Sequence, residues 1–274
     1  MNASAAKRLP IGVFDSGVGG LTVLKALRES LPVEHLVYLG DTARLPYGTK
    51  SAASISRYAC QAARQLQDRE IKLLVVACNT ASAVALDALR EQMAPLPVIG
   101  VVEPGAAAAV AARPGGEHLV LATEATVRLG AYRQAIARRD PAARVHEVAC
   151  ELLVALAEEG WNDGNIAETI VRRYVDEARI TQAPGSVILG CTHFPLLRDT
   201  FSSVFDEGVA IVDSASTTAA AACELLSDLA LASDLQEPGR LTLLATDGPT
   251  RFARVGGRFL GHELTADDVT LVDL

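Results

Sequence analysis

The amino-acid sequence predicts an α/β protein with two similar domains, in which mainly parallel sheets are flanked by helices and the candidate active site lies in the cleft between the domains. Short β-branched apolar runs alternate with longer helical patterns through nearly all of the 274 residues. Half of the residues are hydrophobic and only 4% are aromatic, which suits aliphatic strands and alanine-rich helices. A third observation points to two domains: an apolar strand followed by a cysteine and two polar residues occurs twice, at Cys78 and Cys191.

The expected elements alternate in order, because each β-branched run is followed by a turn and a helical pattern. We expect strands over 11–14, 35–39, 73–77 and 98–102, and helices over 21–30, 51–70 and 79–93. The second group should contain strands over 118–122, 144–148, 187–189 and 209–212, with helices over 126–139, 152–159, 165–181 and 217–231. Late strands are expected over 241–244 and 269–272. The domains should comprise 1–102 plus about 214–274, carrying Cys78, and 103–213, carrying Cys191, with a crossing near 103–105.

Composition excludes several classes of protein. The net charge of -8 and the pI near 5.2 argue against nucleic acid as the main partner. No apolar run approaches the roughly 20 residues of a membrane span, and the first residues lack the pattern of a signal peptide, so we expect no membrane partner. The five cysteines are odd in number, widely spaced and without a CxxC pair, which favours a reducing cytoplasm over a disulfide framework or a metal site.

The cysteines fall into two groups. Cys78 and Cys191 should lie at the carboxyl ends of parallel strands, at exposed junctions where a following helix favours the thiolate. A buried core cysteine is the alternative at each position, but the polar residues that follow argue against it. Cys60, Cys150 and Cys223 lack polar neighbours and are expected to be core residues.

Two loops follow the first two strands and should reach the same sheet edge. The segment DSGVGG at 15–20 is not a dinucleotide fingerprint, because Thr22 stands where a third glycine is needed. We expect it to bind a small carboxylate, with Asp15 and Ser16 as polar contacts. The segment DTARLPYG at 41–48 is either part of the same site or an ordinary turn.

Two opposed thiols suggest a particular chemistry. Inversion of a carbon that carries an acidic hydrogen needs one base on each face, and a thiolate and a thiol can exchange these roles. Loop amides and Asn or Thr side chains could stabilise the carbanion, and His193 could deprotonate or orient the Cys191 thiol. No cofactor is required, and no motif marks a Schiff-base lysine.

Four segments together resemble the cofactor-independent glutamate racemases: DSGVGG at 15–20, LPYGTKS at 45–51, ACNTAS at 77–82 and LGCTHFPLL at 189–197. The resemblance extends over essentially the whole chain. It implies interconversion of L- and D-glutamate without pyridoxal phosphate, supplying D-glutamate for peptidoglycan, and makes a homodimer plausible. It also implies that Cys78 and Cys191 are the acid/base thiols, assisted by Asp15 and His193 respectively.

The resemblance further implies substrate contacts and one more catalytic group. The contacts would be Asp15, Ser16, Tyr47, Gly48, Asn79, Thr80, Thr192 and His193. Glu158 matches a family glutamate in the helix after Ala149-Cys150, although Glu159 adjoins it.

Three departures from the family pattern stand out. Glu151 replaces a usual proline, Phe194 replaces a common tyrosine, and the loop at 122–126 loses its glycines but keeps Thr123 and Thr126 as candidate contacts.

Two other hypotheses remain open at this point. One is a different enzyme of the same superfamily, such as an aspartate racemase or a single-thiol isomerase. The other is a non-catalytic protein that binds an acidic amino acid, although a binding protein gains little from paired thiols.

Overall fold

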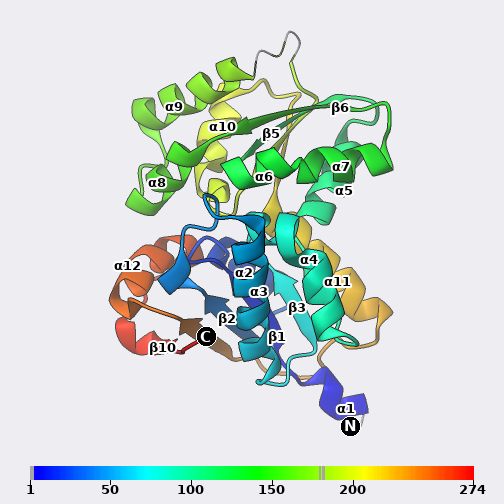
Figure 1. Cartoon of the computed structure of the whole chain (residues 1–274), viewed down its shortest axis with the longest axis vertical. Helices are drawn as coiled ribbons and strands as arrows, with labels where there is room; N and C mark the ends of the chain where they lie inside the picture. The colour runs from blue at the N-terminus through cyan, green and yellow to red at the C-terminus, as the bar shows by residue number, and fades with distance from the viewer. Residues whose placement is uncertain (1–2, 179, 181–182) are drawn as a thin grey trace.

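The computed structural model describes residues 3–178, 180 and 183–274, and its strands form two sheets (Figure 1). The six-stranded sheet has the order β10-β9-β2-β1-β3-β4 and the four-stranded sheet the order β6-β5-β7-β8. The first sheet contains β1 (Ile11–Asp15), β2 (Leu36–Gly40), β3 (Leu73–Val76), β4 (Val98–Gly100), β9 (Leu241–Ala245) and β10 (Val269–Leu271). The second contains β5 (Glu117–Ala122), β6 (Arg144–Ala149), β7 (Ser186–Gly190) and β8 (Ala210–Asp213). Each described pairing is parallel, which confirms the predicted fold class.

Helices connect the strands and cover both sheets (Figure 1). In chain order they are α1 (Ala3–Lys7), α2 (Leu21–Ser30), α3 (Ala52–Gln67), α4 (Asn79–Met93), α5 (Val102–Ala112), α6 (Glu124–Leu129), α7 (Ala131–Arg139), α8 (Glu151–Glu159), α9 (Gly164–Glu177), α10 (Arg198–Val204), α11 (Ser214–Asp228) and α12 (Pro249–Leu260). Short 3-10 turns lie at Thr42–Arg44, Phe194–Leu197 and Ala266–Asp268.

Several expected elements differ from the observed ones. The single helix expected over 126–139 is two helices, because Gly130 adopts a left-handed conformation with φ of 60° and ends α6. The segment at 103–105, where we expected the chain to cross between domains, is helical. It lies in the first turn of α5, which connects β4 of the first sheet to β5 of the second, and Pro104 is tolerated there because the first amides of a helix have no partner within it. The expected helix end at position 181 lies outside the described residues.

Helix α12 was not expected from the sequence, although its pattern is amphipathic. Phe252, Val255 and Phe259 are buried at intervals of three and four residues, while Arg251 and Arg254 are exposed. Pro249 begins the helix and Gly261 ends it in a left-handed conformation. These are ordinary start and stop signals, so the helix could have been found from the sequence.

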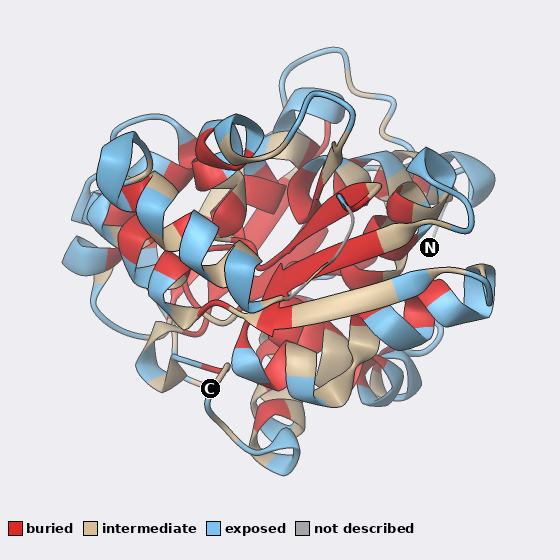
Figure 2. Cartoon of the chain, turned by 90° about the horizontal axis from the view of Figure 1, so that it is seen from above, coloured by how far each residue is buried: buried red, intermediate tan, exposed pale blue. Residues whose placement is uncertain are grey.

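One hydrophobic cluster is shared by the two sheets. It joins residues of the first sheet, such as Val13 and Leu73, to residues of the second, such as Leu119 and Leu189. Figure 2 shows the central strands buried and the outer faces of the helices exposed. Among the described helices, none has both the length and the apolar character that a membrane crossing requires.

The strands of each sheet end in register, which brings the loops after them together. In the first sheet the Asp41 amide donates to the Asp15 carbonyl at 3.0 Å, and the Ala77 amide donates to the Phe14 carbonyl at 2.8 Å. In the second the Cys150 amide donates to the Ala122 carbonyl at 2.8 Å. The loops that follow β1, β2, β3, β5 and β7 carry the polar residues singled out from the sequence.

Candidate active site

A cavity of about 350 Å³ is lined by residues that follow strands of both sheets. The predicted site residues in its lining are Ser16, Tyr47, Gly48, Cys78, Asn79, Thr80, Thr123, Glu158, Cys191, Thr192 and His193. Lining residues that sequence reasoning did not propose as contacts are Gly17, Val18, Leu45, Pro46, Thr49, Glu151, Val154 and Ala155. Two predicted residues, Asp15 and Thr126, are not part of the lining.

Cys78 precedes α4 and acts as its N-cap, since the Ala81 amide donates to the sulfur at 3.4 Å. The thiol donates to the Ser16 hydroxyl oxygen, also at 3.4 Å. Cys78 is only 6% exposed, so the junction is more buried than expected. Burial and the charge of Asp15 raise the pKa of Cys78 to about 11, although Ser16 and the Ala81 amide favour the thiolate. Desolvation therefore outweighs the helix N-terminus at this thiol.

Cys191 follows β7 and is 7% exposed. The segment after it forms a 3-10 turn at Phe194–Leu197, and not the expected helix start. Burial raises the pKa of Cys191 well above its ordinary value, and the His193 backbone amide offsets this only in part. The thiol sulfur lies 3.7 Å from Nδ1 of His193.

His193 connects Cys191 to the candidate carboxylate. Its Nε2 lies 3.2 Å from Oε1 of Glu158, whereas Glu159 is exposed. The hydrogen bond to His193 is the main reason that the pKa of Glu158 is lowered. The structure thus places Glu158, and not its neighbour, in contact with the imidazole.

Asp15 lies beneath the cavity and is 1% exposed. Its Oδ2 accepts a hydrogen bond from the Gly17 amide at 2.8 Å, while Oδ1 has no partner among the described residues. Burial raises the pKa of Asp15, and the Gly17 amide and His193 oppose that rise. Its charge raises the pKa of both Cys78 and Cys191, so it acts on both sides of the site.

The Asn79 side chain has a defined orientation. The Tyr132 hydroxyl donates to Oδ1 of Asn79 at 2.7 Å, which leaves the amide nitrogen Nδ2 buried without a partner in the described structure. Asn79 is among the residues that line the cavity, so Nδ2 is an unpartnered donor next to it. Tyr132, on α7, was not singled out from the sequence, and nothing local indicates that it reaches Asn79.

Three threonine hydroxyls form a chain between the two sheets. Oγ1 of Thr80 lies 2.9 Å from Oγ1 of Thr123, which lies 3.1 Å from Oγ1 of Thr126. Thr80 and Thr123 line the cavity. Thr126 is 0% exposed and contacts Thr123 without lining the cavity. Thr126 therefore contacts a predicted site residue without reaching the cavity itself.

The loop that carries Tyr47 and Gly48 lines the cavity. The Tyr47 hydroxyl donates to Oδ2 of buried Asp41 at 2.6 Å, and the Thr246 hydroxyl donates to Oδ1 at 3.0 Å. Thr246 follows β9, so Asp41 connects the loop to another strand of the same sheet. This network holds Tyr47 against the cavity.

Glu151 is the departure from the family pattern that matters most for the cavity. It lines the cavity beside Gly48 and Thr123, and its Oε1 accepts from the Glu124 amide at 2.7 Å. Burial and the charge of Glu124 raise the pKa of Glu151. Phe194 behaves differently, since it is fully buried against Phe201 and does not line the cavity.

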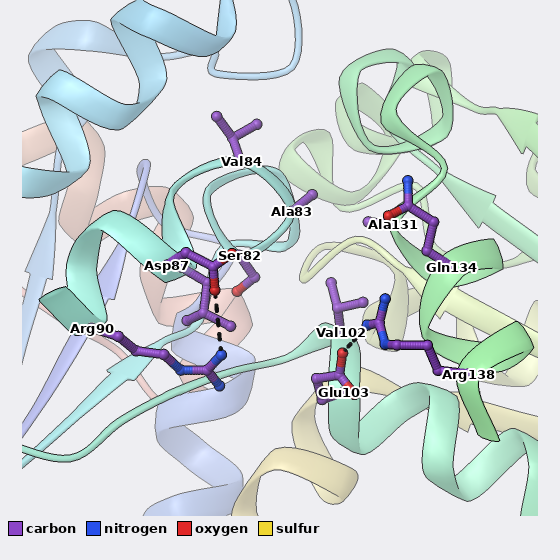
Figure 3. A pocket seen from close by; sticks show the side chains of 11 residues that line it. Ser82, Ala83, Val84, Asp87, Arg90, Val102, Glu103, Ala131, Gln134 and Arg138 are labelled. Carbon is purple, nitrogen blue, oxygen red and sulfur yellow. Dashed lines mark hydrogen bonds and ion pairs between the residues drawn. The ribbon is translucent and has the colours of Figure 1, made fainter.

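A second hollow, of about 410 Å³, lies between α4, α5 and α7 (Figure 3). Its charged side chains pair with one another: Arg90 lies 3.6 Å from Asp87, and Arg138 lies 2.5 Å from Glu103. Its lining contains neither cysteine nor histidine. The described residues also contain no cluster of His, Cys, Asp or Glu arranged to hold a metal ion. The cavity between the thiols is thus the better candidate active site.

Comparisons with known proteins identify the family to which the chain is similar. The model of the family described as Asp/Glu/hydantoin racemase matches residues 11–222. A glutamate racemase from Geobacter metallireducens is 48% identical over 254 residues, which cover 93% of each chain. Another, from Syntrophus aciditrophicus, is 42% identical over 264 residues, covering 96% of this chain and 97% of the relative.

Solved structures show the same relationship. The glutamate racemase of Francisella tularensis, determined in complex with D-glutamate, has a TM-score of 0.89 and 35% identity over 97% of this chain and 98% of that one. The glutamate racemase isoform RacE1 of Bacillus anthracis has a TM-score of 0.91 and 34% identity over 98% of both chains.

Proposed function

Because the chain belongs to the glutamate racemase family and is an amino-acid racemase, we propose that it interconverts L- and D-glutamate by proton transfer at Cα between Cys78 and Cys191. The observation that carries the proposal is that both thiols line one cavity, each after a strand of a different sheet. We further propose that the D-glutamate supplies peptidoglycan synthesis and that the protein acts as a homodimer.

In the proposed reaction one cysteine is a thiolate and the other a thiol. The thiolate takes the Cα proton, and the electron pair left on carbon is delocalised into the α-carboxylate. The opposite thiol then delivers its proton to the other face and becomes the thiolate. One proton leaves and one arrives, and the reverse direction exchanges the two roles. The raised pKa of each thiol suits this task, because a scarcer thiolate is a stronger base toward a weakly acidic C–H bond.

The proton of the Cys191 thiol has a nearby acceptor. If Nε2 of His193 donates to Glu158, then Nδ1 presents its lone pair toward the sulfur 3.7 Å away. On the other side the Ser16 hydroxyl and the Ala81 amide stabilise the Cys78 thiolate. The two halves of the site therefore generate their thiolates by different means.

Hydrogen-bond donors around the cavity would bind the two carboxylates of glutamate. The free Nδ2 of Asn79 is the clearest donor, and it can also stabilise charge that develops on the α-carboxylate. Further contacts are proposed from Ser16, Tyr47, Gly48, Thr80, Thr123, Thr192 and His193. Asp15 and Thr126 would act from behind the lining, through the thiols and through Thr123.

The test is incubation of each glutamate enantiomer with the enzyme in deuterated water. A racemase places deuterium at Cα and inverts the centre, which chiral chromatography with mass detection measures. Cys78→Ser and Cys191→Ser should each reduce inversion at least about a thousandfold, because a serine hydroxyl is a far weaker acid than a thiol.

Matched controls are Cys60→Ser and Cys223→Ser, two cysteines outside the cavity lining that should keep wild-type rates. Inversion at the wild-type rate in either catalytic variant would rule out the two-thiol mechanism. Binding of glutamate without exchange at Cα would instead identify a binding protein.

A further inference from the structure

Helix α12 contacts the Cys191 half of the site from the other sheet. It follows β9 of the six-stranded sheet, whereas Glu158 lies on α8, which follows β6 of the four-stranded sheet (Figure 1). Arg251 Nη2 donates to Glu158 Oε2 at 2.7 Å, and Arg258 Nη1 donates to the Glu158 carbonyl at 2.6 Å. The Phe259 ring meets the His193 imidazole edge-on, with ring centres 5.0 Å apart.

The two carboxylate oxygens of Glu158 have different partners. Oε1 faces Nε2 of His193 at 3.2 Å, and Oε2 faces Arg251. A carboxylate held at both oxygens cannot rotate without losing one of these bonds. The side chain of Glu158 is 19% exposed and that of Arg251 is 52% exposed, so this ion pair lies on the solvent side of the His193 imidazole.

We propose that Arg251 is a positioning residue for proton transfer at Cys191. It orients Glu158, which fixes the His193 imidazole with Nδ1 toward the sulfur. This inference rests on the proposed racemase function and adds a residue that lies outside the cavity lining. These contacts form a ladder that runs from Arg251 through Glu158 and His193 to Cys191. Arg251, at its outer end, lies on α12, which follows a strand of the six-stranded sheet.

Arg251 affects proton transfer at Cys191 because it helps to fix the tautomer of the His193 imidazole. With Glu158 accepting from Nε2–H, Nδ1 is free to take the thiol proton and later to return it. Without Arg251, Oε2 loses its partner, the carboxylate can turn away, and the imidazole can present N–H to the sulfur. Two other charged groups lie nearby but bind elsewhere: Arg258 donates to the Glu158 carbonyl, and Asp15 accepts from the Gly17 amide.

The ladder is confined to one half of the site. Cys78 is served by the Ser16 hydroxyl and the Ala81 amide, neither of which contacts Arg251 or Glu158. Loss of Arg251 should therefore slow the proton transfer at Cys191 and leave the transfer at Cys78 nearly unchanged. A loosening of the whole fold would affect both transfers.

The test compares wild type, Arg251→Gln and Arg251→Lys with L- and D-glutamate, each with hydrogen or deuterium at Cα. An exposed ion pair is modest in energy, so kcat/KM should fall about two- to fivefold in Arg251→Gln. The deuterium isotope effect on kcat/KM should rise for the enantiomer that Cys191 deprotonates and fall for the other. Arg251→Lys should restore part of the rate, because it keeps the charge but not the planar fork.

The matched control is Arg254→Gln, an exposed arginine on the same helix outside the cavity lining, which should behave as wild type. Isotope effects that stay at wild-type values for both enantiomers in Arg251→Gln would overturn the inference while leaving the racemase intact. Equal changes in Arg251→Gln and Arg254→Gln would also overturn it. A wild-type protein that does not exchange the Cα proton would instead refute the proposed function itself.

Discussion

At the scale of single residues, Glu151 is the most unusual feature of the cavity. An acidic side chain lines a space that we assign to a dicarboxylic amino acid, and burial holds its pKa above the ordinary value for glutamate. Below that pKa the group is neutral and can donate a hydrogen bond. Above it the group is an anion that faces an anionic substrate.

The first prediction follows from this change of charge. KM for glutamate should rise as the pH increases through the raised pKa of Glu151, and Glu151→Gln should remove that rise. The difference between the two proteins above this pKa should be about fivefold, the size of a partly screened like-charge repulsion. Steady-state kinetics over a series of pH values measures it, with Glu159→Gln on the exposed face of α8 as control. KM curves of the same shape in wild type and Glu151→Gln would contradict the prediction.

At the scale of elements, the glycine-rich loop after β1 has a packing role in addition to the carboxylate binding proposed for it. A Cβ at Gly19 would lie 2.4 Å from both Nδ1 of His193 and Oγ1 of Thr192. The φ of Gly19 is not in the left-handed region, so the backbone itself would tolerate alanine. This glycine is therefore needed for the close approach of the loop after β7.

The second prediction is that Gly19→Ala lowers activity at least about tenfold while the protein remains folded. The added methyl group would collide with the His193 ring and the Thr192 hydroxyl and so displace the imidazole that faces Cys191, and overpacking of this kind costs about 1–3 kcal/mol of stability. Racemisation rates together with thermal unfolding measure the two effects. Wild-type activity in Gly19→Ala would show that the imidazole position is not critical.

At the scale of the whole molecule, a buried ion pair joins segments that are distant in sequence. Lys72 Nζ contacts Oε2 of Glu34 at 2.5 Å, with side chains only 1% and 2% exposed. Lys72 also donates to the carbonyls of Lys7, in α1, and Leu231, after α11. The pair thus connects the start of β3 to α1, which precedes the first sheet, and to the segment after α11, where the chain returns to the first sheet from the second.

The third prediction concerns this pair. Lys72→Met should destabilise the protein by about 3–5 kcal/mol, because it leaves the Glu34 carboxylate buried without a counter-charge. Urea unfolding measures the loss. The double variant Lys72→Met/Glu34→Gln removes the buried charge and keeps an acceptor for the Ser233 amide, so it should recover much of the stability. A double variant no more stable than Lys72→Met would show that the charge is not the cause.

The parallel α/β class, most strands, and the two thiols with their polar neighbours follow from the amino-acid sequence alone. These features are local: a β-branched run, a cap residue and a turn residue express their preferences within a few positions of each other. Even α12 follows a local pattern, since Phe252, Val255 and Phe259 recur at helical spacing between Pro249 and Gly261. The division into two domains at 102/103 and 213/214 stays a prediction.

Which distant side chains meet depends on the packing of the two sheets and cannot be read from the sequence. In the folded protein Glu158, and not Glu159, contacts His193, and the Tyr132 hydroxyl orients the Asn79 side chain. Glu151 lines the cavity, and Arg251 contacts Glu158 although the two are 93 positions apart in sequence. Burial also raises the pKa of both thiols despite the favourable amides beside them. Such contacts depend on how two sheets pack, and the residues on either side carry no local signal of their partners.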